Sequence, residues 1–279
     1  MPAKATIKSG QFIDHKYRKI VFKSWLVKKA LAQIYIVHGF SEHIDNYQDI
    51  IPLLNKNGFS CHIMDLPGHG LSEGIRGHID DFQDYIENLD LFFKSNPYHQ
   101  SDLPVFLMGH SLGGAIVNRF SLNTKVNING IILTSPLCGL LLNNKIFSLV
   151  FRRLSRKSKT LLFPKPFIFK HLNRTVSKEK YYKTDPLRLH CISPALFLEL
   201  EKNITKTKIS ASKLKIPILI FASSKDKVVS FDAIIRYYQT VSSKDKKLIT
   251  YGEAMHELLQ EEEHSQIIKI ASDWIKKRI

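Results

Sequence analysis

Ser111 is the residue of this sequence whose surroundings most clearly favour chemistry. It lies between Gly109 and Gly113, after the apolar run 105–108 and before an apolar segment of helical length. A sharp turn from strand to helix needs small residues there, because a Cβ at either glycine would collide with the strand or the helix. Such a turn exposes the serine hydroxyl at a helix N-terminus, where an oxyanion is stabilised. An ordinary Gly/Ser turn is the alternative, but the flanking elements favour a nucleophile.

A serine nucleophile needs a base, and the base needs a carboxylate. The base accepts the hydroxyl proton, and the carboxylate fixes its tautomer and stabilises its charge. In the chain order Ser, Asp, His, the acid follows the penultimate predicted strand and the histidine follows the last one. Asp226 and His256 occupy these two loops. Asp232, inside the next predicted helix, and His264, on the final helix, are the weaker alternatives.

Two backbone N–H groups are needed to stabilise the oxyanion. We expect Leu112, directly after the nucleophile, to supply one and Phe40, in the loop after an early strand, to supply the other. The loops also carry four histidines that could instead converge on a metal: His38, His43, His69 and His110. No cysteine or acidic residue accompanies them at the spacing of metal ligands, so we expect neither a metal nor a cofactor.

Strands and helices alternate along the chain, which predicts a mostly parallel sheet flanked by helices. Residues 11–27 alternate polar and apolar side chains, as in an opening antiparallel hairpin. Further strands are expected over 31–37, 59–64, 105–110, 128–134, 216–222 and 247–251, which gives eight, and helices over 46–57, 80–93 and 261–277. Ligands bind at the carboxyl ends of the strands in such a sheet, where the candidate site residues lie.

Residues 136–212 interrupt this alternation, and we call them the cap segment. Strand signals disappear there, and apolar clusters alternate with lysine and arginine. We expect a helical insertion over the site, between the core segments 1–135 and 213–279, with residues 140–142 and 167–169 sheltering an acyl chain.

The net charge of +16 is concentrated in and next to the cap segment. Residues 136–215 contain 18 Lys or Arg and four Asp or Glu. We expect this basic surface to attract anionic lipid. The alternatives are a solvated surface that binds no partner and, less favoured, a surface that binds nucleic acid.

The composition is that of a globular protein in a reducing compartment. The 279 residues are 44% hydrophobic, which suits one α/β domain with an insertion. Cys61, Cys138 and Cys191 are far apart, so neither a disulfide framework nor a zinc site is expected. Neither a signal peptide nor an apolar run of membrane-spanning length is apparent, so we expect a cytoplasmic protein, at most peripheral at a membrane.

Several motifs together resemble the monoacylglycerol lipase and lysophospholipase branch of the α/β-hydrolase family, with its serine aminopeptidase S33-like domain. The matching stretches are 38–43 with Tyr47, 65–74, 109–114, 135–137, 185–187 and the loops of Asp226 and His256. They follow one another along nearly the whole chain. The resemblance implies an α/β-hydrolase fold with a cap, Ser111 as nucleophile, His256 as base and Asp226 as its partner.

The resemblance also implies a cofactor-free serine esterase that cleaves one acyl chain from a glycerol or glycerophosphate backbone. General carboxylesterases and S33 peptidases share this triad and are the alternatives, together with a non-catalytic protein that binds through its basic cap segment. The chain departs from the family at Ser223, where glycine is usual three residues before the acid, and at 152–157, which has no counterpart.

Overall fold

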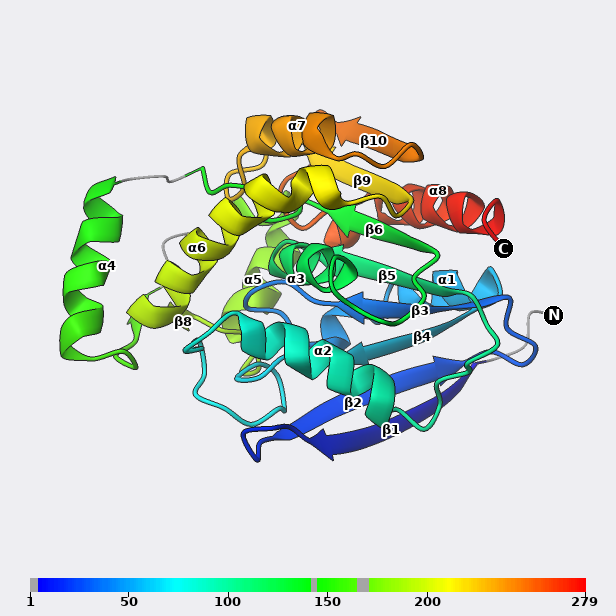
Figure 1. The fold of residues 1–279 in the computed structure, drawn as a ribbon, viewed down its shortest axis with the longest axis horizontal. Coiled ribbons are helices and arrows are strands. Elements are labelled where there is room, and N and C mark those ends of the chain that lie inside the picture. The colour runs from blue at the N-terminus through cyan, green and yellow to red at the C-terminus, as the bar shows by residue number, and fades with distance from the viewer. Residues whose placement is uncertain (1–4, 142–144, 165–170) are drawn as a thin grey trace.

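An eight-stranded sheet forms the centre of the fold (Figure 1). The structure, a computed structural model, describes residues 5–141, 145–164 and 171–279. Across the sheet the strands are β1 (Thr6–Ile13), β2 (Lys19–Leu26), β4 (Phe59–Met64), β3 (Ala32–Val37), β5 (Val105–His110), β6 (Gly130–Thr134), β9 (Ile218–Ser223) and β10 (Lys246–Tyr251). β2 runs antiparallel to β1 and β4, and the other neighbours are parallel. The predicted mostly parallel sheet is confirmed.

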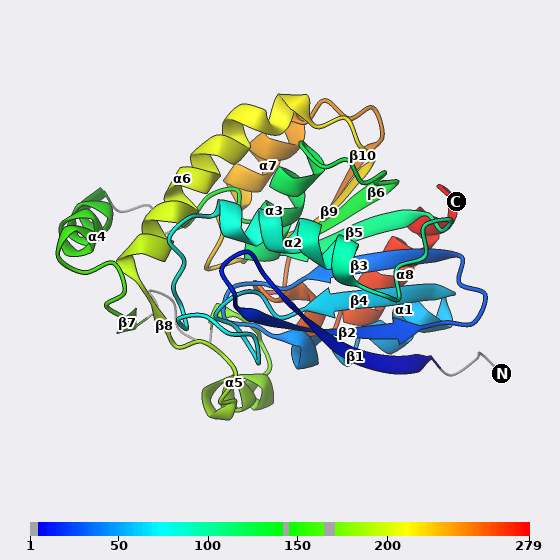
Figure 2. The ribbon, with the colours of Figure 1, turned by 60° about the horizontal axis from the view of Figure 1, so that its bottom comes forward.

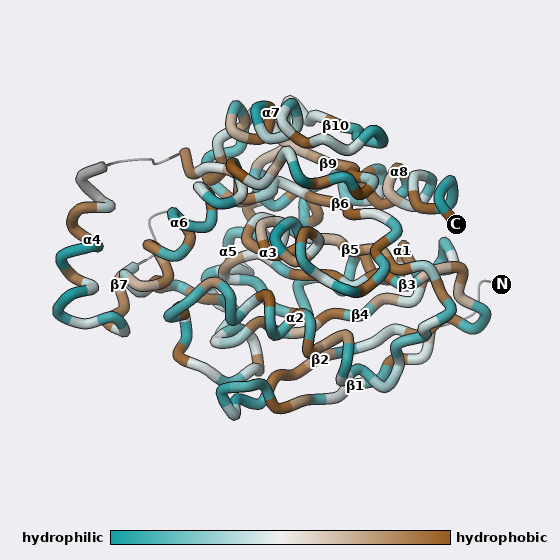
Figure 3. The backbone as a smooth tube through the Cα atoms, viewed as in Figure 1, coloured by the Kyte–Doolittle hydropathy of each residue, from teal (hydrophilic) through white to brown (hydrophobic). Residues whose placement is uncertain are grey.

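Helices cover both faces of this sheet (Figures 1 and 2). One face carries α2 (Gln83–Ser95), α3 (Leu112–Ser121) and α7 (Phe231–Thr240), and the other carries α1 (Ile51–Lys56) and α8 (His264–Lys276). Strand β3 sends Tyr35 and Val37 into one hydrophobic core and Ile34 and Ile36 into the other, because successive side chains of a strand point to opposite faces. Strands β6 and β9, covered on both faces, are accordingly mostly apolar (Figure 3), whereas β3 and β4 also bury the polar residues Gln33, Ser60 and His62.

The connection from β6 to β9 contains the whole cap segment. It holds α4 (Lys145–Lys157), β7 (Phe163–Pro164), α5 (Val176–Thr184), β8 (Cys191–Ile192), α6 (Pro194–Ser210) and a short 3-10 helix, η3 (Ala211–Lys213). Helix α4 lies at the end of the molecule away from both termini (Figure 1). The two-residue strands β7 and β8 pair with each other. The sequence does not predict them, because two residues are too few for an alternating pattern to register.

The helix expected over 46–57 is the clearest difference from the sequence interpretation. The chain instead forms a 3-10 helix, η1 (Ile44–Tyr47), and then the short α1. Pro52 lies in the first turn of α1, where its missing N–H is tolerated, and it disfavours helical structure in the residues before it. The final helix likewise begins at His264, after the 3-10 helix η4 (Leu258–Gln260).

The longest helix among the described residues is α6, with 17 residues. No helix there combines the length and the apolar composition that crossing a bilayer requires.

Candidate active site

Ser111 forms the sharp turn between β5 and α3. Its backbone has φ 50° and ψ −112°, an unusual conformation for a residue with a side chain. Backbone hydrogen bonds hold it on several sides: its N–H donates to the Thr134 carbonyl over 3.0 Å, and its carbonyl accepts from Ala115 and Leu137 over 3.2 and 3.0 Å. The neighbouring strand and helix therefore maintain the strained turn.

The glycines on either side allow this turn to pack tightly. A Cβ added to Gly109 would lie 2.5 Å from the Gly113 carbonyl oxygen, and one added to Gly113 would overlap the Val37 carbonyl oxygen of β3. Because both obstacles are backbone atoms, they have little freedom to move away. The sequence interpretation of these two glycines agrees with this packing.

Ser111, His256 and Asp226 lie in one chain of hydrogen bonds. The Ser111 Oγ is 2.9 Å from His256 Nε2, and His256 Nδ1 is 2.7 Å from Asp226 Oδ2. The other oxygen of Asp226 accepts the N–H groups of Val228 and Val229 over 2.7 and 2.9 Å. All three members of the chain are buried. This is the arrangement in which an imidazole can take the proton of a serine hydroxyl.

The weaker alternatives lie elsewhere. Asp232 is in the first turn of α7. His264 begins α8, and its Nδ1 lies 2.8 Å from the Glu261 carbonyl oxygen.

The charges around His256 favour its protonated form. Burial alone would lower the pKa of His256, but the Asp226 carboxylate opposes this through its charge and hydrogen bond, and the pKa is raised above 6.5. Burial likewise opposes ionisation of Asp226, yet His256 and the two N–H donors hold its pKa below its ordinary value. Asp226 is therefore a carboxylate suited to stabilising an imidazolium.

The loop that carries His256 is anchored by Ser135 and Ser223. The Ser135 hydroxyl donates to the His256 carbonyl over 2.8 Å, and the Ser223 hydroxyl donates to the Ala254 carbonyl. Ser223 also accepts the Lys225 N–H over 3.0 Å. The serine found here in place of the usual glycine thus ties the loop of Asp226 to the loop of His256.

Phe40 and Leu112 both adjoin Ser111. Leu112 is the first residue of α3, and Phe40 lines the same cavity as Ser111. A Cβ added to Gly39 would lie 2.8 Å from His110 Cδ2 and 3.4 Å from the Ser111 Cβ, so there is little room for a side chain between the loop of Phe40 and the turn. The Glu42 carboxylate fixes this loop by accepting the Gly39 N–H over 2.7 Å.

The family described as serine aminopeptidase, S33 matches residues 28–263. The chain belongs to this family. Among its curated relatives, Phospholipase YtpA of Bacillus subtilis is 30% identical over 252 residues, covering 89% of this chain and 96% of that protein. Monoglyceride lipase of Homo sapiens is 28% identical over 280 residues, covering 96% of this chain and 88% of that protein. The chain is accordingly a hydrolase of the lipase and esterase type.

Solved structures share the fold of this S33 hydrolase. Monoacylglycerol lipase of Paleococcus ferrophilus superposes with a TM-score of 0.82 at 24% identity, covering 98% of this chain and all (100%) of that one. A soluble variant of the Saccharomyces cerevisiae monoglyceride lipase gives 0.86 at 19% identity, covering 99% and 96%. The α/β-hydrolase fold implied by the motifs is confirmed.

A small apolar cavity of about 50 Å³ adjoins Ser111 and His256 in this S33 hydrolase. Side chains of the cap segment and the core line it together, among them Leu137, Leu140, Leu172, Ile192, Phe197, Leu200 and Val228. A larger groove of about 1,020 Å³ lies between α4, α6 and α7, away from the serine, and shares Leu140 with the cavity. Leu142 and residues 167–169, expected to shelter an acyl chain, lie outside the described residues.

The histidines weighed as metal ligands make hydrogen bonds of their own. His38 Nε2 accepts the Leu66 N–H over 2.9 Å, and His43 Nε2 lies 2.8 Å from Asp185 of the cap segment. Nδ1 of His69 faces the Pro67 carbonyl and Nδ1 of His110 faces the Thr134 carbonyl.

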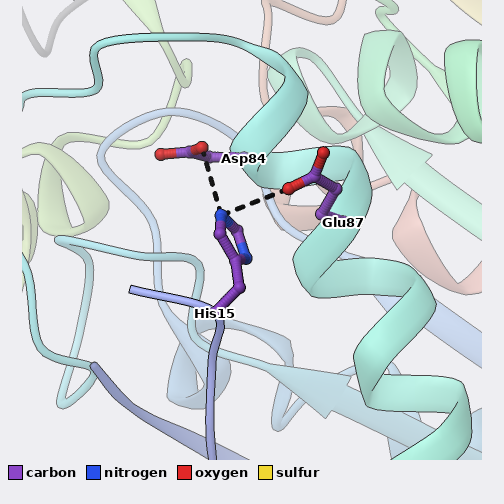
Figure 4. A group of neighbouring side chains, drawn as sticks. All are labelled: His15, Asp84 and Glu87. Atoms are coloured by element: carbon purple, nitrogen blue, oxygen red, sulfur yellow. Dashed lines mark ion pairs between the residues drawn. The ribbon is translucent and has the colours of Figure 1, made fainter. Parts of the chain in front are cut away.

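One other group of possible metal ligands occurs among the described residues: His15, Asp84 and Glu87 (Figure 4). His15 Nε2 lies 3.5 Å from Asp84 and 3.2 Å from Glu87. Two cations already contact Asp84, Lys16 at 2.5 Å and Arg18 at 3.7 Å. These ion pairs join the β1–β2 turn to α2 and leave little negative charge for an added cation.

Sequence reasoning missed three buried charged residues beside the site: Glu42, Arg188 and Glu257. Glu42 and Glu257 lie within or next to recognised motifs, which was the available signal. Arg188 likewise directly follows the recognised motif 185–187, but that pattern did not indicate that its side chain would be buried.

The packing of the turn predicts that Gly113→Ala destabilises the protein and displaces Ser111. Because the new methyl group meets the backbone of β3, the free energy of unfolding should fall by about 1–3 kcal/mol, as overpacking generally costs. Urea unfolding measures this loss, and the labelling rate with a fluorophosphonate reports the serine. Gly252→Ala is the matched control, since a Cβ there meets nothing within 4 Å. Equal stability of the two variants would contradict the packing argument.

Proposed function

We propose that this S33 hydrolase cleaves the carboxylic ester of a single-chain lipid, a monoacylglycerol or a lysophospholipid, through an acyl-enzyme intermediate. The observation that carries the proposal is the hydrogen-bonded series Asp226, His256 and Ser111 beside an apolar cavity. The names of the relatives, a phospholipase and monoglyceride lipases, support the lipid substrate.

In the proposed reaction the Ser111 oxygen attacks the ester carbonyl while His256 Nε2 takes its proton. The N–H groups of Phe40 and Leu112 stabilise the oxyanion of the tetrahedral intermediate. As this intermediate collapses, His256 returns the proton to the departing alcohol oxygen and the acyl group stays on Ser111. A water molecule, deprotonated by His256, then attacks the acyl-enzyme, and the bond to Ser111 breaks as His256 returns the proton to the Ser111 oxygen and the fatty acid leaves. The sequence predicts no cofactor, and none takes part.

The size of the cavity limits how the substrate enters. Binding pockets for small molecules usually measure about 300–1,000 Å³, whereas the space beside Ser111 is about 50 Å³. We infer that cap-segment side chains such as Leu140, Leu172 and Phe197 move apart when an acyl chain binds. The apolar acyl chain then takes the place of apolar side chains, so water stays excluded from the site.

A substrate panel tests the proposed function. We expect turnover of monoacylglycerols or lysophospholipids to exceed that of short p-nitrophenyl esters and of proline peptides, in kcat/KM. Preferential cleavage of the short esters would favour a general carboxylesterase, and cleavage of peptides alone would reject the ester assignment. Ser111→Ala should abolish turnover and fluorophosphonate labelling.

The same assay separates the roles within the triad. His256→Ala should lower kcat about as much as Ser111→Ala, and Asp226→Asn should lower it by roughly 10⁴, because the wrong imidazole tautomer is then favoured. Near-normal turnover of Asp226→Asn would show that another residue serves as the acid.

The pKa of His256 predicts the pH dependence. A base must be neutral to accept a proton, so a raised pKa means that activity is lost at a higher pH on acidification. For an uncharged ester, kcat/KM should therefore fall on acidification with a midpoint above pH 6.5. Circular dichroism over the same pH range confirms that the protein stays folded. A midpoint at or below 6.5 would contradict the electrostatic argument.

The basic surface of α4 suits attraction to anionic membranes. Arg152, Arg153, Arg156 and Lys157 are all exposed. Since each cation near such a surface contributes about 1 kcal/mol, we expect co-sedimentation with anionic vesicles that weakens as salt rises. Changing all four residues to Gln should reduce this binding.

The control carries the same change of charge away from α4. Lys8, Lys28, Lys244 and Lys277 are exposed, and their joint change to Gln should leave most of the binding intact. Binding that ignores salt, or that falls equally in both variants, would reject a specific role for α4.

A further inference from the structure

A buried ion pair joins the cap segment to the loop of His256. Arg188 follows α5 in the cap segment, and its side chain is fully buried. Its Nη2 lies 2.5 Å from Oε1 of Glu257, the residue directly after His256. The Arg188 guanidinium also stacks on the Tyr182 ring, 3.9 Å from its centroid. The ring and the carboxylate together fix the position of the guanidinium.

The same guanidinium faces the loop that carries Phe40. It donates to Ser41 Oγ over 3.5 Å and to Asn46 Oδ1 over 3.4 Å. The next residue, Leu189, donates its N–H to the Ser41 carbonyl over 3.3 Å. One cap-segment side chain therefore contacts both loops that flank Ser111.

Arg188 balances the negative charge buried around these loops. Burial opposes its charge, but Glu257 and Glu42 outweigh this and hold its pKa above the ordinary value. Burial also opposes ionisation of Glu257, yet the Arg188 charge keeps the pKa of that carboxyl low. If Arg188 were removed, the carboxylates of Glu42 and Glu257 would stay buried near each other with no guanidinium to balance their charge.

A second contact ties the His256 loop to the cap segment. The Glu257 N–H donates to the Leu172 carbonyl over 2.8 Å. Both the backbone and the side chain of Glu257 are thus held from the cap segment, and a shift there would move the adjoining His256 relative to Ser111.

We propose that Arg188 is a positioning residue: through Glu257 and the loop of Phe40, it keeps His256 and the oxyanion donor in register with Ser111. The inference rests on the proposed serine hydrolase function. It gives the cap segment a part in assembling the catalytic geometry in addition to lining the cavity.

Arg188→Met and Arg188→Lys test this on the full chain. A misplacement of about 1 Å can lower a rate by roughly 10²-fold, so Arg188→Met should lower kcat by about 10- to 100-fold. KM should change by less than about threefold, because the lost contacts do not reach the substrate. Arg188→Lys, which keeps the charge without the planar fork, should recover part of the rate.

The double variant Arg188→Met with Glu257→Gln separates positioning from charge balance. It removes both members of the pair, so thermal stability should recover towards that of the wild type, while kcat should stay low. Return of kcat to the wild-type value in this variant would overturn the proposal.

Glu257→Gln adds a measurement, the pH dependence of kcat/KM, that a purely structural role of the ion pair would leave unchanged. The charged or titratable groups that face His256 are Asp226, Glu257, Glu42 and His110. Both Glu257 and Glu42 raise the pKa of His256. Removing the Glu257 charge should move the acid limb of kcat/KM to lower pH, and an unmoved limb would overturn the link between the ion pair and His256.

Arg18→Met is the control for loss of an arginine ion pair away from the site, in which the carboxylate is fully buried and the arginine partly so. Arg18 Nη2 lies 2.6 Å from Asp14 at the far β1–β2 turn. Its loss should lower the melting temperature and leave kcat unchanged. If Arg188→Met behaves in the same way, the pair is only structural and the proposal fails.

Fluorophosphonate labelling keeps this test separate from the choice of substrate. The labelling rate depends on the reactivity of Ser111 whichever ester is cleaved. Slower labelling of folded Arg188→Met supports positioning even if the lipid assignment is wrong. An absence of labelling in the wild type would instead reject the proposed hydrolase function.

Discussion

The site depends on the close approach of α3 to β3. The Gly113 backbone packs so tightly on the Val37 carbonyl that no side chain fits between them, and Ser111 adopts a positive φ as the chain turns. A wider turn would accept ordinary residues but would withdraw the hydroxyl from the carboxyl ends of the strands. There β6, β9 and β10 bring Ser135, Asp226 and His256 within reach, since parallel strands end at one edge. The strained turn thus exposes the Ser111 hydroxyl, and the sheet geometry brings the other site residues to it.

Around this turn, buried charges are arranged as interdependent pairs. Asp226 faces His256 directly, whereas Glu42 and Glu257 lie farther out and face Arg188. In a medium of low polarity each charge depends on its partner, so changes in one loop are felt in the others. The electrostatic surroundings of the histidine consequently include residues from the cap segment as well as the core.

The residues placed at strand ends were predictable from the sequence. Ser111 and Asp226 follow the apolar strands β5 and β9, and His256 follows the partly exposed β10, so the order of these loops along the chain was the signal that they lie together. Arg188 was not predictable, because its partner Glu257 is 69 residues away and their contact depends on the path of the cap segment. The helix expected over 46–57 forms only over 51–56, because Pro52 disfavours helical structure in the residues before it and outweighs the apolar pattern there.

The cap segment leaves the sheet at the end of β6 and returns at the start of β9, and these two strands are adjacent and parallel. Pairing Ile131 with Ile218 therefore closes a loop that contains the whole insertion. The entropy lost in closing a flexible loop grows only with the logarithm of its length, so doubling the insertion would cost about 0.6 kcal/mol. On that ground the sheet tolerates large differences in insertion length, and the cap segment can diverge in size and sequence while the strands that carry Ser111, Asp226 and His256 stay the same.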